Sequence, residues 1–113
     1  MNNIIFLGNN FEIINEVVTS LKEANVSFCR NINEVSSAIS KQKPNLVLVE
    51  FMMEKKDVLS DINELSKIVS DSPIVFLNNF ENSNLKEEIK KIIPNCKFLD
   101  YEANALKDFI QKA

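Results

Sequence analysis

The feature that most constrains this 113-residue chain is a short apolar run in its middle, Leu46-Val47-Leu48-Val49, followed at once by Glu50. Four consecutive apolar residues without alternation are typical of a β-strand that is covered on both faces. Pro44 lies just before the run and ends any preceding helix. The run therefore predicts a central strand with helices on both sides, and it places a carboxylate where that strand leaves the core.

Similar short runs recur along the chain and alternate with segments of helical periodicity. Each run is followed by apolar residues at the three- and four-residue spacing of an amphipathic helix. The predicted strands are residues 3–7, 26–29, 46–49, 73–77 and 97–99, and the predicted helices carry apolar residues within 11–21, 32–39, 58–69, 85–93 and 106–110. This order predicts an α/β fold with five parallel strands and helices on both faces, in three layers.

Three asparagines precede the predicted helices at the spacing of a helix cap. An Asn followed three residues later by Glu is a plausible capping arrangement, because the asparagine oxygen can accept a bond from an unpaired amide of the first turn. The predicted pairs are Asn9 with Glu12, Asn31 with Glu34, and Asn84 with Glu87.

Composition indicates one ordinary folded domain across residues 1–113. The chain is 45% apolar and 26% charged, its net charge is −3, and its basic residues are spread out, so no nucleic-acid footprint is visible. No apolar run approaches the roughly 20 residues of a membrane span, and the start lacks the pattern of a signal peptide. Cys29 and Cys96 are far apart and indicate buried thiols in a reducing compartment rather than a disulfide. We therefore expect a cytoplasmic domain without direct contact to nucleic acid or membrane.

Two residue types that most enzyme sites depend on are scarce. The chain has no histidine, so the commonest general base and transition-metal ligand are missing. Gly8 is its single glycine, so neither a P-loop nor a G-x-G-x-x-G motif can be written. We expect a protein that is not an enzyme, with no catalytic residues, no cofactor and no resident metal.

The functional crevice of a parallel α/β sheet lies outside the carboxyl ends of its strands. The segments that follow the predicted strands there are Gly8-Asn9-Asn10, Glu50-Phe51-Met52, Asn78-Asn79 and Asp100-Tyr101.

The segment Pro44–Met53, PNLVLVEFMM, resembles the pattern P-D-L-V-L-L-D-x-M-M-P of the receiver domain of bacterial response regulators, the CheY-like fold. Ser72–Leu77 is similar to the fourth strand of that family and Lys97–Leu99 to the fifth, so the resemblance covers essentially the whole length. It implies a (βα)5, flavodoxin-like architecture and a role in two-component signal transduction or transcription control.

Members of that family transfer a phosphoryl group to an aspartate after the third strand. They use an acidic pair for magnesium, a Thr or Ser after strand four and a Lys after strand five. Carried over by position, the acidic pair falls on Gly8 and Asn9, the acceptor on Glu50, the hydroxyl on Asn78 and the lysine on Tyr101. Glu102 stands where a proline usually follows, and Phe98 is at the position of the switch aromatic.

These replacements indicate a degenerate site. Magnesium prefers several carboxylate oxygens, and phosphoryl transfer depends on metal and cationic groups that neutralise developing charge. Glu50 is also one methylene longer than aspartate, which misplaces the attacking oxygen. We therefore interpret the chain as a pseudo-receiver that does not accept phosphate by the usual route.

Glu50 and Phe98 each have alternative roles. Glu50 is a mimic of a phosphorylated aspartate, a structural carboxylate that accepts hydrogen bonds from Asn9, Asn78 or backbone amides, or a chance polar residue at a strand end. Phe98 is a switch aromatic or an ordinary core aromatic.

The resemblance implies a partner surface on the fourth helix, fifth strand and fifth helix, through which the domain forms a homodimer or docks on another protein. Its candidate residues have mixed charge: Lys86, Lys90, Lys97, Asp100, Glu102 and Lys107. The domain is either free-standing or the amino-terminal part of a longer regulator.

Two other functions remain open at this point. One is a phosphoaccepting regulator with a non-standard acid such as Glu54 or Asp100. The other is a flavodoxin-like module that binds a small molecule over the carboxyl edge of the sheet.

Overall fold

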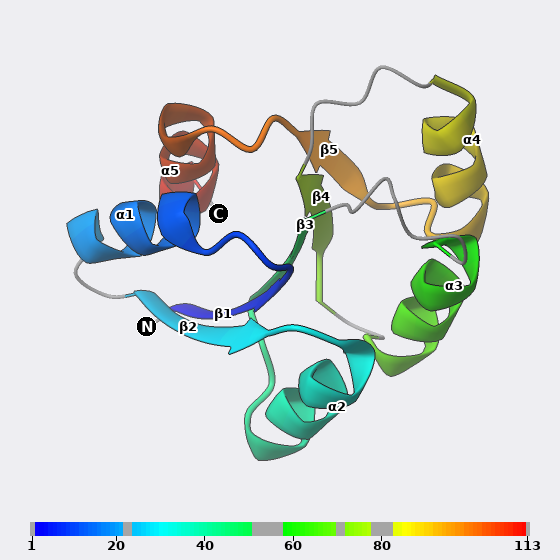
Figure 1. Cartoon of the computed structure of the whole chain (residues 1–113), viewed down its shortest axis with the longest axis horizontal. Helices are drawn as coiled ribbons and strands as arrows, with labels where there is room; N and C mark the ends of the chain where they lie inside the picture. Colours follow the sequence, from blue (N-terminus) through cyan, green and yellow to red (C-terminus); the bar gives the residue numbers. More distant parts are fainter. Residues whose placement is uncertain (1, 22–23, 51–57, 70–71, 78–82, 113) are drawn as a thin grey trace.

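The chain folds into a parallel sheet flanked by helices, and the computed structural model describes residues 2–21, 24–50, 58–69, 72–77 and 83–112. The strands run parallel in the order β2-β1-β3-β4-β5 (Figure 1), which confirms the predicted α/β fold. The strands are β1 (Asn2–Leu7), β2 (Ala24–Cys29), β3 (Leu46–Glu50), β4 (Ile74–Leu77) and β5 (Lys97–Leu99). The helices are α1 (Glu12–Ser20), α2 (Ile32–Lys41), α3 (Val58–Ile68), α4 (Ser83–Ile92) and α5 (Ala103–Lys112).

The helices divide between the two faces of the sheet. Helices α1 and α5 lie together on one face, and α2, α3 and α4 cover the other (Figure 1). Each face has its own apolar core: Ile14 and Leu106 pack in the first, and Val35, Ile62 and Ile89 in the second. The three layers follow from this division. None of the helices in the described ranges is long and apolar enough to span a membrane.

Strand β3 shows why its sequence is continuously apolar. Leu46 and Leu48 belong to the core beneath α1 and α5, whereas Val47 and Val49 belong to the core beneath the other three helices. Successive side chains of a strand point to opposite faces. Because both faces are covered, all four side chains are buried, and Glu50 is the first residue of the strand that is partly exposed.

The predicted helix caps have different outcomes. The Oδ1 atom of Asn31 accepts a hydrogen bond from the amide of Glu34 at 2.9 Å, which confirms that cap. The cap assigned to Asn9 is wrong, because the N-cap position of α1 is Phe11, which makes no side-chain cap bond. The Oδ1 atom of Asn10 accepts a bond from the amide of Glu12 at 3.1 Å. The cap assigned to Asn84 is also wrong: α4 begins at Ser83, so Asn84 lies inside its first turn.

The two cysteines behave as the sequence predicts. Cys29 and Cys96 are both buried and both are free thiols. Burial raises the pKa of each thiol above its ordinary value. Their thiolate fraction is therefore low at neutral pH, as in an inert core residue.

Candidate functional site

The candidate site lies at the carboxyl ends of β1, β3 and β5. Four positions that the sequence singled out meet there: Gly8, Asn9, Glu50 and Tyr101. Asn78 and Glu54 lie outside the described residues. The described part of the site consists of the β1–α1 loop (residues 8–11), Glu50 and the β5–α5 loop (residues 100–102).

Glu50 is the last residue of β3, and its carboxylate holds the β1–α1 loop. Its Oε1 atom accepts hydrogen bonds from the backbone amides of Asn9 at 2.8 Å and Asn10 at 3.0 Å. Hydrogen bonds to an ionised acceptor are stronger than neutral ones. These are the bonds expected of a structural carboxylate.

Gly8 leaves the room that the Glu50 side chain fills. A β-carbon at position 8 would lie 2.6 Å from Cβ of Glu50, 2.7 Å from its Oε1 and 3.0 Å from Cε1 of Phe6. The first two distances are far below van der Waals contact, so no residue with a side chain fits without movement of its neighbours. The sequence identified Gly8 only as a neutral substitute for an acid and missed this steric role. Its being the single glycine of the chain was the available signal.

Tyr101 ties the β5–α5 loop to the start of α1. Its hydroxyl donates to the carbonyl of Asn10 at 2.6 Å and accepts from the amide of Ile14 at 3.3 Å. Ile14 lies in the first turn of α1, where amides have no partner within the helix. The tyrosine ring also packs against the ring of Phe6, with centroids 5.7 Å apart. The phenol thus takes part in two long-range bonds that the residue pattern does not reveal.

The environment of Tyr101 keeps it protonated. Burial raises the pKa of its phenol to about 12; the amide of Ile14 lowers it, and the nearby charge of Glu50 raises it. Tyr101 therefore carries no charge at neutral pH and supplies no cation at the position where the family pattern has lysine.

Asn10 is the centre of the network. Its amide donates to Glu50, its carbonyl accepts from Tyr101, and its side-chain oxygen accepts from Glu12. Three segments far apart in sequence are thereby joined by direct hydrogen bonds. Within the described ranges, no three Cys, Asp or Glu side chains form a group that could hold a metal ion.

The two acids after β5 lie apart from this network. Asp100 is exposed. Glu102 is the residue before α5, and its Oε1 accepts from the amide of Asn104 at 3.0 Å, so it caps that helix.

Phe98 is half-buried between the sheet and α4. Its ring stacks on that of Phe76 in β4, with centroids 5.7 Å apart. The Nζ atoms of Lys86 and Lys90 lie 5.6 Å and 5.9 Å from its centroid, within the range of a cation–π contact. Phe98 therefore packs on the core with one part and meets two lysines of α4 with another.

The proposed partner face has a second contact of the same kind. The Nζ atom of Lys97, in β5, lies 5.5 Å from the ring centroid of Phe109 in α5. Among the charged candidates of this face, Lys86 and Lys107 are half-buried and the others are exposed: Lys90, Lys97, Asp100 and Glu102.

Comparison with known proteins identifies the fold. No family model and no curated protein matches the chain. Among solved structures, the signal receiver domain of a DNA-binding response regulator from Colwellia psychrerythraea 34H aligns with a TM-score of 0.77 and 12% identity, over 99% of this chain and 97% of that one. The signal receiver domain of a modulated diguanylate cyclase from Desulfovibrio desulfuricans G20 gives 0.75 and 17%, over 100% and 93%.

A third neighbour is the receiver domain of the Francisella response regulator 1452, with a TM-score of 0.73 and 15% identity, over 99% of this chain and 95% of that one. At these identities the comparison shows a shared fold. The chain has the receiver-like, CheY-like fold.

Proposed function

We propose that this chain, which has the receiver fold of response regulators, is a regulatory domain that acts through contact with other proteins and does not accept phosphate at Glu50. The observation that carries the proposal is the pair of hydrogen bonds from the Asn9 and Asn10 amides to Oε1 of Glu50. They give the carboxylate a structural task, which supports a role other than the acceptance of phosphate.

The described residues around Glu50 support this reading. Phosphoryl transfer depends on a metal ion and cationic groups to neutralise the charge of the transferred group. Gly8 and Asn9 provide no carboxylate for the metal, and a carboxylate at position 8 would collide with Glu50 itself. Tyr101 is neutral and already bonded to Asn10. The site is therefore better suited to hold one conformation than to change with phosphorylation.

A domain with a fixed site can still regulate through its surface. The α4–β5–α5 face supports this role, because Lys86 and Lys90 lie over Phe98, and Lys97 lies over Phe109. Lysines held over aromatic rings combine charge with apolar area, which suits a protein partner or a second copy of the chain. Two buried free thiols fit a reducing cytoplasm, and the net charge of −3 does not favour direct binding to nucleic acid.

The proposal is tested by amide NMR during titration with Mg²⁺ and then with beryllofluoride, a phosphoryl mimic. We expect no saturable shift at Asn9, Asn10 or Tyr101. A receiver domain that does accept phosphate, titrated with the same solutions, is the control for the reagents. Saturable shifts at these three residues would overturn the proposal and identify a working phosphorylation site.

A further inference from the structure

The outer edge of strand β2 is open to another strand. β2 pairs with β1 in unbroken register from Asn2–Ala24 to Leu7–Cys29, without a bulge, and no other described strand pairs with it. Its sequence, ANVSFC, has no charged residue and no proline. Soluble proteins usually protect sheet edges with such residues or with bulges. The opposite edge is protected in this way, since β5 has only three residues, begins with Lys97 and follows Pro94.

The backbone groups on that edge can be identified. The amide of Gly8 donates to the carbonyl of Cys29 at 3.0 Å, so the backbone of Cys29 faces β1. Backbone groups alternate along a strand, so Asn25 and Ser27 also face β1. The amide and carbonyl groups of Val26 and Phe28 therefore point outward, where an added strand would bond to them.

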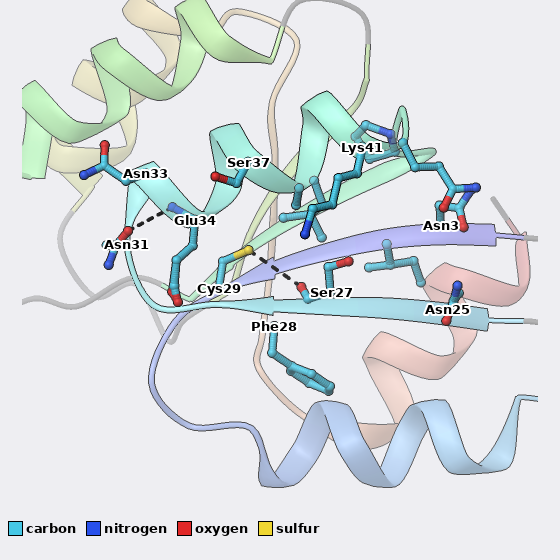
Figure 2. A pocket seen from close by; sticks show the side chains of 15 residues that line it. Asn3, Asn25, Ser27, Phe28, Cys29, Asn31, Asn33, Glu34, Ser37 and Lys41 are labelled. Atoms are coloured by element: carbon cyan, nitrogen blue, oxygen red, sulfur yellow. Dashed lines mark hydrogen bonds between the residues drawn. The ribbon is translucent and has the colours of Figure 1, made fainter.

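The two sides of the edge differ in chemistry. On the α2 side, a groove of about 690 Å³ is lined mainly by polar residues, with Asn25 and Ser27 from β2 and Ser37 from α2 (Figure 2). On the other side, Phe28 is 41% exposed, although its ring contacts that of Phe11 at 5.1 Å between centroids. An added strand must therefore present small polar side chains to the groove and apolar ones beside Phe28.

We propose that a second copy of this chain pairs with it, β2 against β2 in antiparallel direction, to form one continuous sheet. β2 itself has the required alternation, since Asn25 and Ser27 point to the groove side and Phe28 to the opposite side (Figure 2). A two-fold axis perpendicular to the sheet keeps like sides together, so polar meets polar and apolar meets apolar. This interface is independent of the α4–β5–α5 face, which lies at the other edge of the sheet.

The charges on α2 also favour a second copy of the chain as the partner. Glu34 and Lys41 line the groove from opposite ends of α2 (Figure 2), and both are exposed. The two-fold axis reverses the direction of the second groove, so Glu34 of each copy lies toward Lys41 of the other. Paired strands lie about 4.8 Å apart. Because α2 packs against both β1 and β2, the two α2 helices would be separated by roughly 10 Å, an ordinary distance for packed helices.

Sedimentation equilibrium of the full chain tests the proposal, and we expect a concentration-dependent dimer. Val26→Pro removes an outward amide, a change that an edge strand tolerates. It should weaken the dimer about 10-fold or more, since two symmetry-related bonds are lost. An amide NMR spectrum establishes that the variant is folded.

A charge exchange on α2 gives a second test. Because Oε2 of Glu34 also accepts a hydrogen bond from the amide of Arg30 at 3.3 Å, an amide NMR spectrum of each variant establishes that α2 is intact. Lys41→Glu and Glu34→Lys should each weaken the dimer by roughly fivefold, from two symmetry-related surface pairs. The double variant should recover most of the loss, because the pair is restored across the interface. Lys67→Glu, the same charge change on α3 outside the groove, should leave the dimer unchanged.

Three results would overturn the proposal. The first is a chain that stays monomeric at millimolar concentration. This holds also if the β2 edge then binds an extended peptide. The second is a dimer that Val26→Pro and Lys41→Glu leave intact and that Lys90→Glu dissociates, because it uses the α4–β5–α5 face. The third is a double exchange that recovers nothing.

Discussion

The side chain of Glu50 occupies the space beside Gly8 that a β-carbon would need. Leu7 of β1 pairs with Val49 of β3, and Gly8 and Glu50 are the residues that come directly after this pair. The 2.6 Å between a β-carbon at position 8 and Cβ of Glu50 leaves no freedom for rotation to relieve the overlap, because Cβ does not move with the side-chain torsions. Glycine and glutamate at these positions are thus one structural unit.

Gly8→Ala should therefore destabilise the fold. We expect a loss of about 1–3 kcal/mol in the free energy of unfolding, the usual range for an added methyl group in a packed site. Urea denaturation followed by circular dichroism measures it. The amides of Asn9 and Asn10 should also shift in the NMR spectrum, since the loop that they belong to must move.

Two backgrounds separate steric overlap from other effects of the alanine. In Glu50→Gly the nearest atom is removed, so Gly8→Ala should cost much less than in the parent. In Glu50→Ala the β-carbon at position 50 remains, so most of the cost should remain as well. Equal costs in both backgrounds would contradict the overlap described here.

Glu50→Gln tests what the charge of the carboxylate contributes. Glutamine keeps an oxygen acceptor but loses the charge, and neutral hydrogen bonds are about half as strong. We expect a loss of about 1 kcal/mol and faster hydrogen exchange at the amides of Asn9 and Asn10. Spectral changes should be confined to the β1–α1 loop. If Glu50 acted as a mimic of a phosphorylated residue, the change would also reach Phe98 and the lysines of α4.

Tyr101 offers a titration without interference, because it is the only tyrosine and the chain has no tryptophan. We expect the phenol of the folded protein to titrate near pH 12, against about 10 in an unfolded chain. Ultraviolet absorbance of the tyrosinate measures both values. A folded-state pKa near 10 would contradict the buried, bonded position of the hydroxyl.

The same shift predicts how stability depends on pH. Because the pKa is higher in the folded state, the contribution of the phenol is complete below pH 10 and is lost as the pH rises from 10 toward 12. Tyr101→Phe lacks the titrating group and should be less stable than the parent near neutral pH by about 1 kcal/mol, from the lost bonds. The difference between the two proteins should shrink across that pH interval. A constant difference would count against the hydrogen bond to Asn10.

Most strands and helices could be predicted from the spacing of apolar residues, because that spacing depends on residues close together in the sequence. The buried run from Leu46 to Val49 required cover on both faces, and the helical spacing of apolar residues supplied the cover. Asn31 was predictable as a cap for the same reason, since its partner is three residues away. That Gly8, Asn9, Glu50 and Tyr101 lie at one edge of the sheet also followed, because the carboxyl ends of parallel strands lie together.

The connections of the site were not predictable in this way. Asn10 is 40 residues from Glu50 and 91 from Tyr101, and no spacing rule relates such positions. The cap of α1 was assigned to Asn9 because the sequence pattern takes no account of Glu50. In the structure the amides of Asn9 and Asn10 are bonded to that carboxylate, the N-cap position is Phe11, and the side chain of Asn10 accepts from the amide of Glu12. The start of α1 thus depends on tertiary contacts of the β1–α1 loop that the spacing of Asn and Glu does not describe.

The side-chain bonds at the starts of α1 and α2 can be measured with alanine substitutions at Asn10 and at the cap residue Asn31. Asn31→Ala and Asn10→Ala each remove a side-chain oxygen that accepts from a first-turn amide, and each should cost about 1 kcal/mol. Asn33→Ala is a matched control on the exposed side of α2, where alanine favours the helix, so it should be neutral or slightly stabilising. In Asn10→Ala the backbone bonds to Glu50 and Tyr101 remain available, so the amide shifts should stay local to residues 9–12. A neutral Asn10→Ala would show that the start of α1 depends on Tyr101 and Glu50 alone.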